Sequence, residues 1–134
     1  MSRMKIPIPK IDNATKREIE NTKYLKQHLK RYVELINGES KSIKSAVNTT
    51  VNNFGGYKKL EETDAFLHRK MMESMEKIEK QVLDINKIYS KEKCKYKEQV
   101  ELATKIFDAQ VTVMIIKEYM YRIDKMMIEE ANSN

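Results

Sequence analysis

The residues whose types and spacing suggest chemistry are lysines and arginines near the amino terminus. Lys16, Lys23 and Lys30 recur every seven residues, so on a helix they would follow one side. Arg17 and Arg31 add guanidinium groups, whose planar fork can hold a phosphate or a base edge through two hydrogen bonds. A basic helix is the usual electrostatic footprint of a protein that binds nucleic acid. The residues that we expect to contact the DNA backbone are Lys16, Arg17, Lys23, Lys26, Lys30 and Arg31.

The distribution of charge along the chain favours the same hypothesis. The chain has 26 Lys+Arg and 20 Asp+Glu, which gives a formal net charge of +6. Residues 1–45 contain 11 bases and 5 acids, whereas residues 46–134 contain 15 of each. The first third of the chain therefore carries the whole excess of positive charge. The alternative is an ordinary solvated face, since lysines are mostly exposed in any protein.

A second candidate set for DNA contact lies near the carboxyl terminus. The stretch Gln99–Ala103, followed by Val113 and Ile116, resembles the core of a helix-turn-helix. In that register the residues that would face a major groove and read bases are Thr112, Lys117, Tyr121 and Arg122. Two features weigh against this interpretation: Phe107 stands at the place of the usual turn glycine, and the apolar repeat continues past it without a break.

No residue constellation typical of catalysis or metal binding occurs in the sequence. Cys94 is the single cysteine, and His28 and His68 are 40 residues apart, so neither a disulfide framework nor a Cys/His zinc cluster is expected within one chain. The Walker A, GxSxG and HExxH motifs are absent. We therefore expect a protein that is not an enzyme and that needs no metal and no cofactor.

The composition predicts a single all-α domain. The 134 residues include only 3 Gly and 2 Pro, and neither type occurs after Gly56. The longest apolar run, Val113–Ile116, is far shorter than the ~20 residues of a membrane span. The amino terminus also lacks the apolar segment of a secretory signal. The expected location is the cytoplasm, with no membrane association.

The first half of the chain is expected to contain an arm, a helix and a loop. Pro7 and Pro9 predict an extended basic arm over residues 1–13, because proline disfavours helical conformation in the residue before it. A capping box at Thr15–Glu18 predicts a basic helix over about 14–37, which Asn37 and Gly38 would end. The polar, Asn- and Gly-containing stretch that follows predicts a flexible loop over 38–57.

The second half is expected to form a long antiparallel hairpin of two helices, at about 60–89 and 98–130. Apolar residues in both segments alternate at steps of three and four, which is a heptad pattern. The first stripe is Met71, Met75, Ile78, Val82, Ile85 and Tyr89. The second is Leu102, Ile106, Ala109, Val113, Ile116, Met120, Ile123 and Met127.

Helix 98–130 carries more apolar residues than one partner helix can bury. Those beside its stripe are Val100, Ala103, Phe107, Met114, Ile115, Tyr119 and Met126. Either the helix at 14–37 or a second copy of the chain would cover them. We expect a dimeric helical bundle, with a closed three-helix monomer as the alternative. The expected oligomer or partner interface comprises Met71, Ile78, Val82, Ile106, Phe107, Val113, Met120 and Met127.

Short motifs in the first half resemble a known family. They are Pro9-Lys10-Ile11-Asp12, Ala14-Thr15-Lys16-Arg17, Leu25 with Leu29-Lys30-Arg31-Tyr32, and Ser42-Ile43-Lys44-Ser45, followed by a charged helix such as Met71–Asn86. With these motifs, over about residues 8–86, the chain resembles the ArpU-type family of phage late-gene transcriptional regulators. The segment Tyr121–Lys125 and the pair Glu130-Ala131 are also similar to the end of that family. The resemblance implies a phage or prophage origin and a regulatory role.

Together these observations give two functional hypotheses. The first is a small dimeric, phage-type transcriptional regulator that contacts DNA phosphates through its basic first helix. The second is a helical interaction protein, such as a phage assembly factor or an inhibitor of a host protein. Its Met-rich face would bind the partner, because methionine adapts to irregular surfaces. That face would comprise Met114, Met120, Met126 and Met127 with Phe107 and Tyr119.

Overall fold

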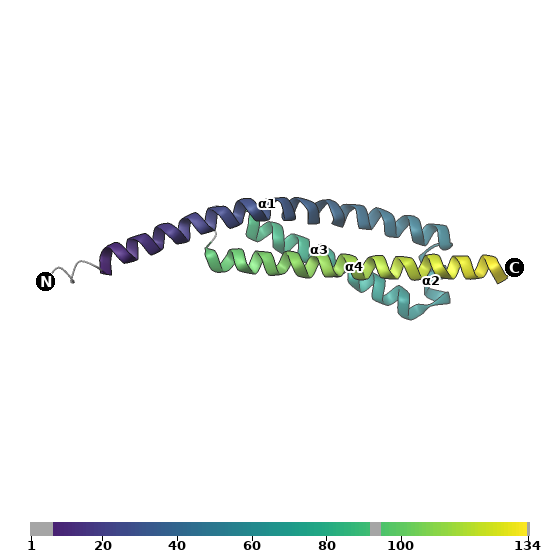
Figure 1. Cartoon of the computed structure of the whole chain (residues 1–134). Helices are drawn as coiled ribbons and strands as arrows, with labels where there is room; N and C mark the ends of the chain where they lie inside the picture. Colours follow the sequence, from purple (N-terminus) through teal and green to yellow (C-terminus); the bar gives the residue numbers. More distant parts are fainter. Residues whose placement is uncertain (1–6, 92–94, 134) are drawn as a thin grey trace.

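The protein is an elongated bundle of helices. The structure, a computed structural model, describes residues 7–91 and 95–133, and it describes side chains from Gln27 on. Its helices are α1 (Pro7–Phe54), α2 (Tyr57–Thr63), α3 (Ala65–Tyr89) and α4 (Tyr96–Ser133). These described ranges contain no strand, so the prediction of an all-α protein is confirmed. In Figure 1, α3 and α4 run in opposite directions and α1 lies along both.

The expected extended arm is wrong from residue 7 onward, because α1 begins at Pro7; residues 1–6 lie outside the described part. Proline is compatible with the first turn of a helix, where the backbone N–H groups have no intrahelical acceptor. Pro7 and Pro9 both lie in that turn. The two prolines therefore start the helix and do not delay it.

The expected loop over residues 38–57 is also wrong, because α1 continues to Phe54. Ile43, Val47, Val51 and Phe54 are all buried and follow one another at steps of four, four and three. Their burial in the core outweighs the weak helix propensity of the Ser, Thr and Asn residues between them. A tight corner at Gly55 and Gly56, with φ of 125° and 104°, then ends the helix. Such positive φ values favour glycine.

Asn37, which we expected at a helix end, lies inside α1 and joins it to α3. Its side-chain amide donates to Oδ1 of Asn86 at 3.0 Å, and the amide of Asn86 donates back to Oδ1 of Asn37 at 2.7 Å. The neighbouring Gly38 lies on the exposed side, with no atom within 4 Å of the position of a Cβ. A glycine there costs helix stability but does not stop the helix.

The helix expected at 60–89 is divided in two at Asp64. Oδ1 of Asp64 accepts a hydrogen bond from the backbone N–H of Leu67 at 3.0 Å, which is the N-cap of α3. The short helix α2 packs against α1 and α3. The helix expected at 98–130 is present as α4, two to three residues longer at each end.

The core lies where α4 packs against both α1 and α3. The buried apolar residues are Leu29, Val33, Ile36, Ile43, Val47, Val51 and Phe54 of α1; Leu60 of α2; Leu67, Met71, Ile78 and Ile85 of α3; and Leu102, Ile106, Ala109, Val113, Ile116 and Ile123 of α4. Both apolar stripes predicted for the second half are part of this core or pack against it. Among the described helices, none is long and apolar enough to cross a membrane.

Candidate nucleic-acid interface

The amino-terminal part of α1 extends beyond the other helices. Figure 1 shows this purple part of the helix continuing past the end at which α3 finishes and α4 begins. The first buried side chain of α1, among those described from residue 27, is Leu29. At about 1.5 Å per residue, a helix from residue 7 to residue 28 is roughly 33 Å long. We call residues 7–31 of α1 the basic segment.

The basic segment and the residues before it carry the entire net charge of the protein. Residues 1–31 contain nine bases and three acids, and residues 32–134 contain seventeen of each. The bundle is therefore neutral overall, and the positive charge is confined to the first 31 residues. Of these, residues 7–31, on the end of α1 that extends past the bundle, contain seven bases and three acids. Concentrated charge of one sign on an exposed element attracts a polyanion over long range.

Lys30 and Arg31 are the two residues of the predicted DNA-contacting set whose side chains are described. Both are exposed, and no ion pair joins either to a carboxylate among the described side chains. The side chains of Lys16, Arg17, Lys23 and Lys26 lie outside those described. Their positions do belong to the continuous helix α1.

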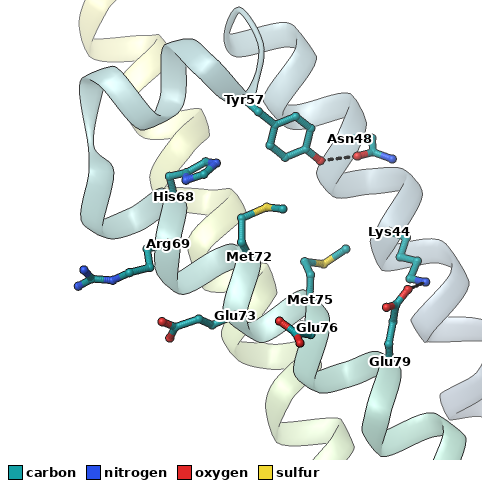
Figure 2. Close-up of a pocket in the computed structure, with 10 residues that line it drawn as sticks. All are labelled: Lys44, Asn48, Tyr57, His68, Arg69, Met72, Glu73, Met75, Glu76 and Glu79. Atoms are coloured by element: carbon teal, nitrogen blue, oxygen red, sulfur yellow. Dashed lines mark hydrogen bonds and ion pairs between the residues drawn. The ribbon is translucent and has the colours of Figure 1, made fainter.

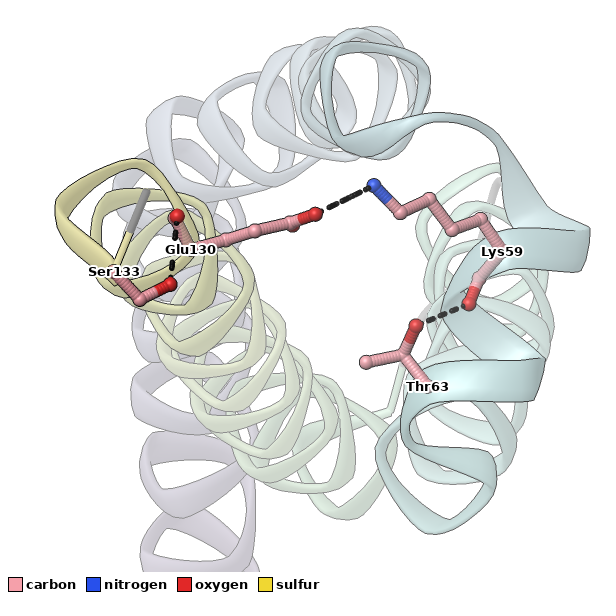
Figure 3. A network of polar contacts seen from close by, with 4 residues as sticks. All are labelled: Lys59, Thr63, Glu130 and Ser133. Carbon is pink, nitrogen blue, oxygen red and sulfur yellow. Dashed lines mark hydrogen bonds and ion pairs between the residues drawn. The ribbon is translucent and has the colours of Figure 1, made fainter.

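Several lysines of the bundle are neutralised by carboxylates on neighbouring helices. The Nζ atom of Lys59 is 3.4 Å from Oε1 of Glu130, which joins α2 to the end of α4 (Figure 3). Lys44 of α1 pairs with Glu79 of α3. At the corner before α4, a hydrogen bond from Lys91 is the main cause that lowers the pKa of Glu98. These lysines hold helices together, whereas Lys30 and Arg31 face solvent.

The predicted base-reading set on α4 does not form a helix-turn-helix. α4 is continuous from Tyr96 to Ser133, so this segment has no turn to separate two helices. Thr112 is 2% exposed, and its hydroxyl donates to the carbonyl oxygen of Asp108 at 3.1 Å. The prediction that Thr112 faces a major groove is therefore wrong: α4 is covered on two sides, so its buried face is wider than one stripe.

The other three members of that set are exposed but do not form a basic surface. Arg122 lies 3.6 Å from Oε1 of Glu118 and 5.9 Å from the ring centroid of Tyr119. Lys117 and Tyr121 are exposed on the same helix. The structure thus separates the two predicted sets of DNA-binding residues, with one on the extended end of α1 and the other along the bundle.

The predicted interface residues are mostly part of the chain's own core. Met71, Ile78, Ile106 and Val113 are at most 3% exposed, so the prediction that they bind another chain is wrong. These side chains are buried by α1, α3 and α4 of the same chain. The same core partly buries the side chains of Val82, Met120 and Met127. Phe107, at 64% exposed, is the member that remains available to a partner.

A cleft of about 600 Å³ lies between α1, α2 and α3 (Figure 2). The hydroxyl of Tyr57 donates to Oδ1 of Asn48 across it, and burial raises the pKa of Tyr57. On the same side of the molecule, Nδ1 of His68 lies 3.7 Å from Oε2 of Glu61. These polar groups contact one another and support the packing of α2. No cluster of three or more His, Cys, Asp or Glu side chains suited to a metal ion occurs among the described residues.

Comparisons with protein-family models, curated proteins and solved structures find no match to this chain. The resemblance to ArpU-type regulators therefore stays a prediction from short motifs.

Proposed function

We propose that the protein binds the phosphate backbone of double-stranded DNA through the basic segment of α1. The observation that supports this most is the confinement of the whole net charge to residues 1–31, of which residues 7–31 form a helix end that extends past a neutral bundle. The exposed side chains of Lys30 and Arg31, which no ion pair joins to a carboxylate among the side chains described from residue 27 on, agree with it. The role would be that of a non-enzymatic, phage-type transcriptional regulator in the bacterial cytoplasm.

The binding would work by counterion release. Each lysine or arginine that neutralises a phosphate frees a cation condensed on the duplex, and this gain in entropy stabilises the complex. A single helix fits the major groove, which is about 12 Å wide, so the basic segment could lie along the groove and contact phosphates on both sides. Contacts of this kind position a protein but carry no sequence information.

The experiment is a fluorescence anisotropy titration of the full chain with two duplexes of unrelated sequence. We expect similar affinities for both, and a logarithm of the binding constant that falls linearly with the logarithm of salt concentration. With six phosphate contacts the slope would be about −5. Absence of binding to either duplex at low salt would refute the proposal. Strong preference for one duplex would show base reading, which this mechanism does not provide.

A second candidate function is that of a protein-interaction factor, and it rests on a separate observation. Phe107 and Met114 of α4 are 64% and 68% exposed and lie seven residues apart on one side of the helix, and contiguous exposed apolar surface marks interaction sites. The remaining residues of the predicted Met-rich face, Tyr119, Met120, Met126 and Met127, pack partly against the core. Co-purification of a host or phage protein that resists nuclease treatment, together with no DNA binding, would favour this candidate.

A further inference from the structure

α4 carries a second apolar stripe, on the side turned away from the core. Val100, Phe107, Met114, Tyr121 and Ile128 follow one another at intervals of seven residues. All five side chains are exposed, by 47% to 68%. Val111 and Ile115, exposed by 37% and 39%, widen the stripe at its centre. We call these seven residues the outer stripe.

The outer stripe is large enough to form a stable interface. An aromatic side chain presents about 150–250 Å² when fully exposed and an aliphatic one less, so these seven side chains, 37% to 68% exposed, present at most roughly 900 Å². The largest apolar patch of a typical monomer is about 300–600 Å². A stable protein interface buries about 800 Å² on each partner. The seven-residue spacing keeps these side chains on one side of α4 over most of its length, so an elongated surface such as another long helix could cover them.

We propose that the outer stripe binds the same stripe of a second copy of the chain, with the two α4 helices antiparallel. Placing Met114 at the twofold axis brings Val100 of one copy opposite Ile128 of the other. Phe107 then lies opposite Tyr121 of the other copy, and aromatic pairs of this kind add stability beyond the area that they bury. Each of these two pairs occurs twice, once on each side of the axis, as a twofold interface requires.

The charges that flank the outer stripe oppose the antiparallel orientation less than the parallel one. On one flank, Glu101 of each copy would lie opposite Glu129 of the other near the ends of the interface, which gives two repulsive pairs. Nearer the centre, Asp108 of each copy would lie opposite Arg122 of the other, which gives two attractive pairs. Ile115 of each copy would meet Ile115 of the other between them. In a coiled coil, opposite charges at such flanking positions set the orientation of the partner.

A parallel arrangement would place like charges together. Lys117 of one copy would lie beside Arg122 of the other, and Asp124 would lie beside Glu129. Beside the outer stripe, Glu118 and Lys125 would each face their own counterpart. Juxtaposed like charges oppose association, so the parallel dimer is disfavoured.

The antiparallel dimer has a consequence for the ends of the molecule. The basic segment of α1 extends past the end at which α4 begins (Figure 1). Antiparallel pairing of α4 would therefore place the two basic segments at opposite ends of the dimer. This geometry would suit contact with two separate stretches of duplex. The dimer itself does not depend on DNA binding and is tested without DNA.

The test measures the mass of the protein in solution and the disulfide cross-linking of two cysteine variants. Analytical ultracentrifugation of the full chain is expected to give twice the monomer mass of 15.9 kDa. In a Cys94→Ser background, an equal mixture of the Val100→Cys and Ile128→Cys variants should form a disulfide between the two variants on mild oxidation. Each variant alone should form little. Efficient cross-linking of either variant alone would show a parallel dimer and overturn the proposal, as would a monomer at micromolar concentration.

The matched variants are Met114→Glu on the outer stripe and Leu83→Glu on α3, where Leu83 is 70% exposed and lies outside the stripe. Both add one charge to an exposed apolar position, so neither should alter the circular dichroism spectrum. We expect Met114→Glu to weaken the dimer by at least 100-fold and Leu83→Glu to leave its dissociation constant unchanged. Equal effects of the two substitutions would overturn the assignment of the interface to α4.

Discussion

Replacing Lys23, Lys26 and Lys30 with glutamine is expected to weaken binding to duplex DNA by about 100- to 1,000-fold at low salt. The three lysines belong to the basic segment, and their loss would remove half of the excess positive charge of residues 1–31. Glutamine has nearly the same helix propensity as lysine, so α1 should remain helical. Because each phosphate contact contributes about 0.9 to the salt slope, the slope should become less steep by about 3. Fluorescence anisotropy over a range of salt concentrations measures both quantities.

A matched control comes from three exposed lysines of α3. The variant Lys77→Gln, Lys80→Gln and Lys87→Gln makes the same change in net charge on the bundle. If the basic segment makes the contacts, this variant should bind DNA within about threefold of the unaltered protein, and its slope should be unchanged. Equal weakening by the two triple variants would mean that net charge alone governs binding, and the basic segment would then have no special role.

Replacing Ile43 with alanine is expected to destabilise the protein by about 2–5 kcal/mol. Ile43 is 4% exposed and packs in the core, in the part of α1 that the sequence indicated as a loop. A small domain has a free energy of unfolding of only about 5–15 kcal/mol, so the loss would be a large share of the total. Urea unfolding followed by circular dichroism, at one fixed protein concentration, would measure it.

The neighbouring exposed residue Lys41 supplies the control for this experiment. Lys41→Ala should change the free energy of unfolding by no more than about 0.5 kcal/mol. If Ile43→Ala were as mild as Lys41→Ala, residues 38–54 could not be part of the core.

The sequence predicts α3 and α4 well because their apolar residues follow one strict period over many turns. The continuation of α1 is harder to predict, because the exposed face of residues 38–54 is rich in Ser, Thr and Asn, which are typical of loops. The signal that could have revealed it is the spacing of Ile43, Val47, Val51 and Phe54. The break at Asp64 had a comparable signal, since aspartate is a preferred N-cap.

The candidate sites show a different limit of prediction from sequence. α4 has apolar residues on two sides, and periodicity alone does not indicate which of them faces the rest of the chain. Ile106 and Val113 therefore resembled interface residues but belong to the core, whereas Phe107 is exposed. For the basic segment the sequence sufficed to locate the charge and to show that the rest of the chain is neutral, but the structure was needed to find that this segment extends past the other helices.

The most direct test of DNA binding by the basic segment is lysine footprinting of the full chain with and without a duplex. Lysine acetylation, measured by mass spectrometry, reports which amines a bound phosphate backbone covers. We predict that DNA protects Lys16, Lys23, Lys26 and Lys30, while Lys117 and Lys125 of α4 react as fast as in the free protein. Protection of the α4 lysines, with the lysines of the basic segment unaffected, would contradict the account.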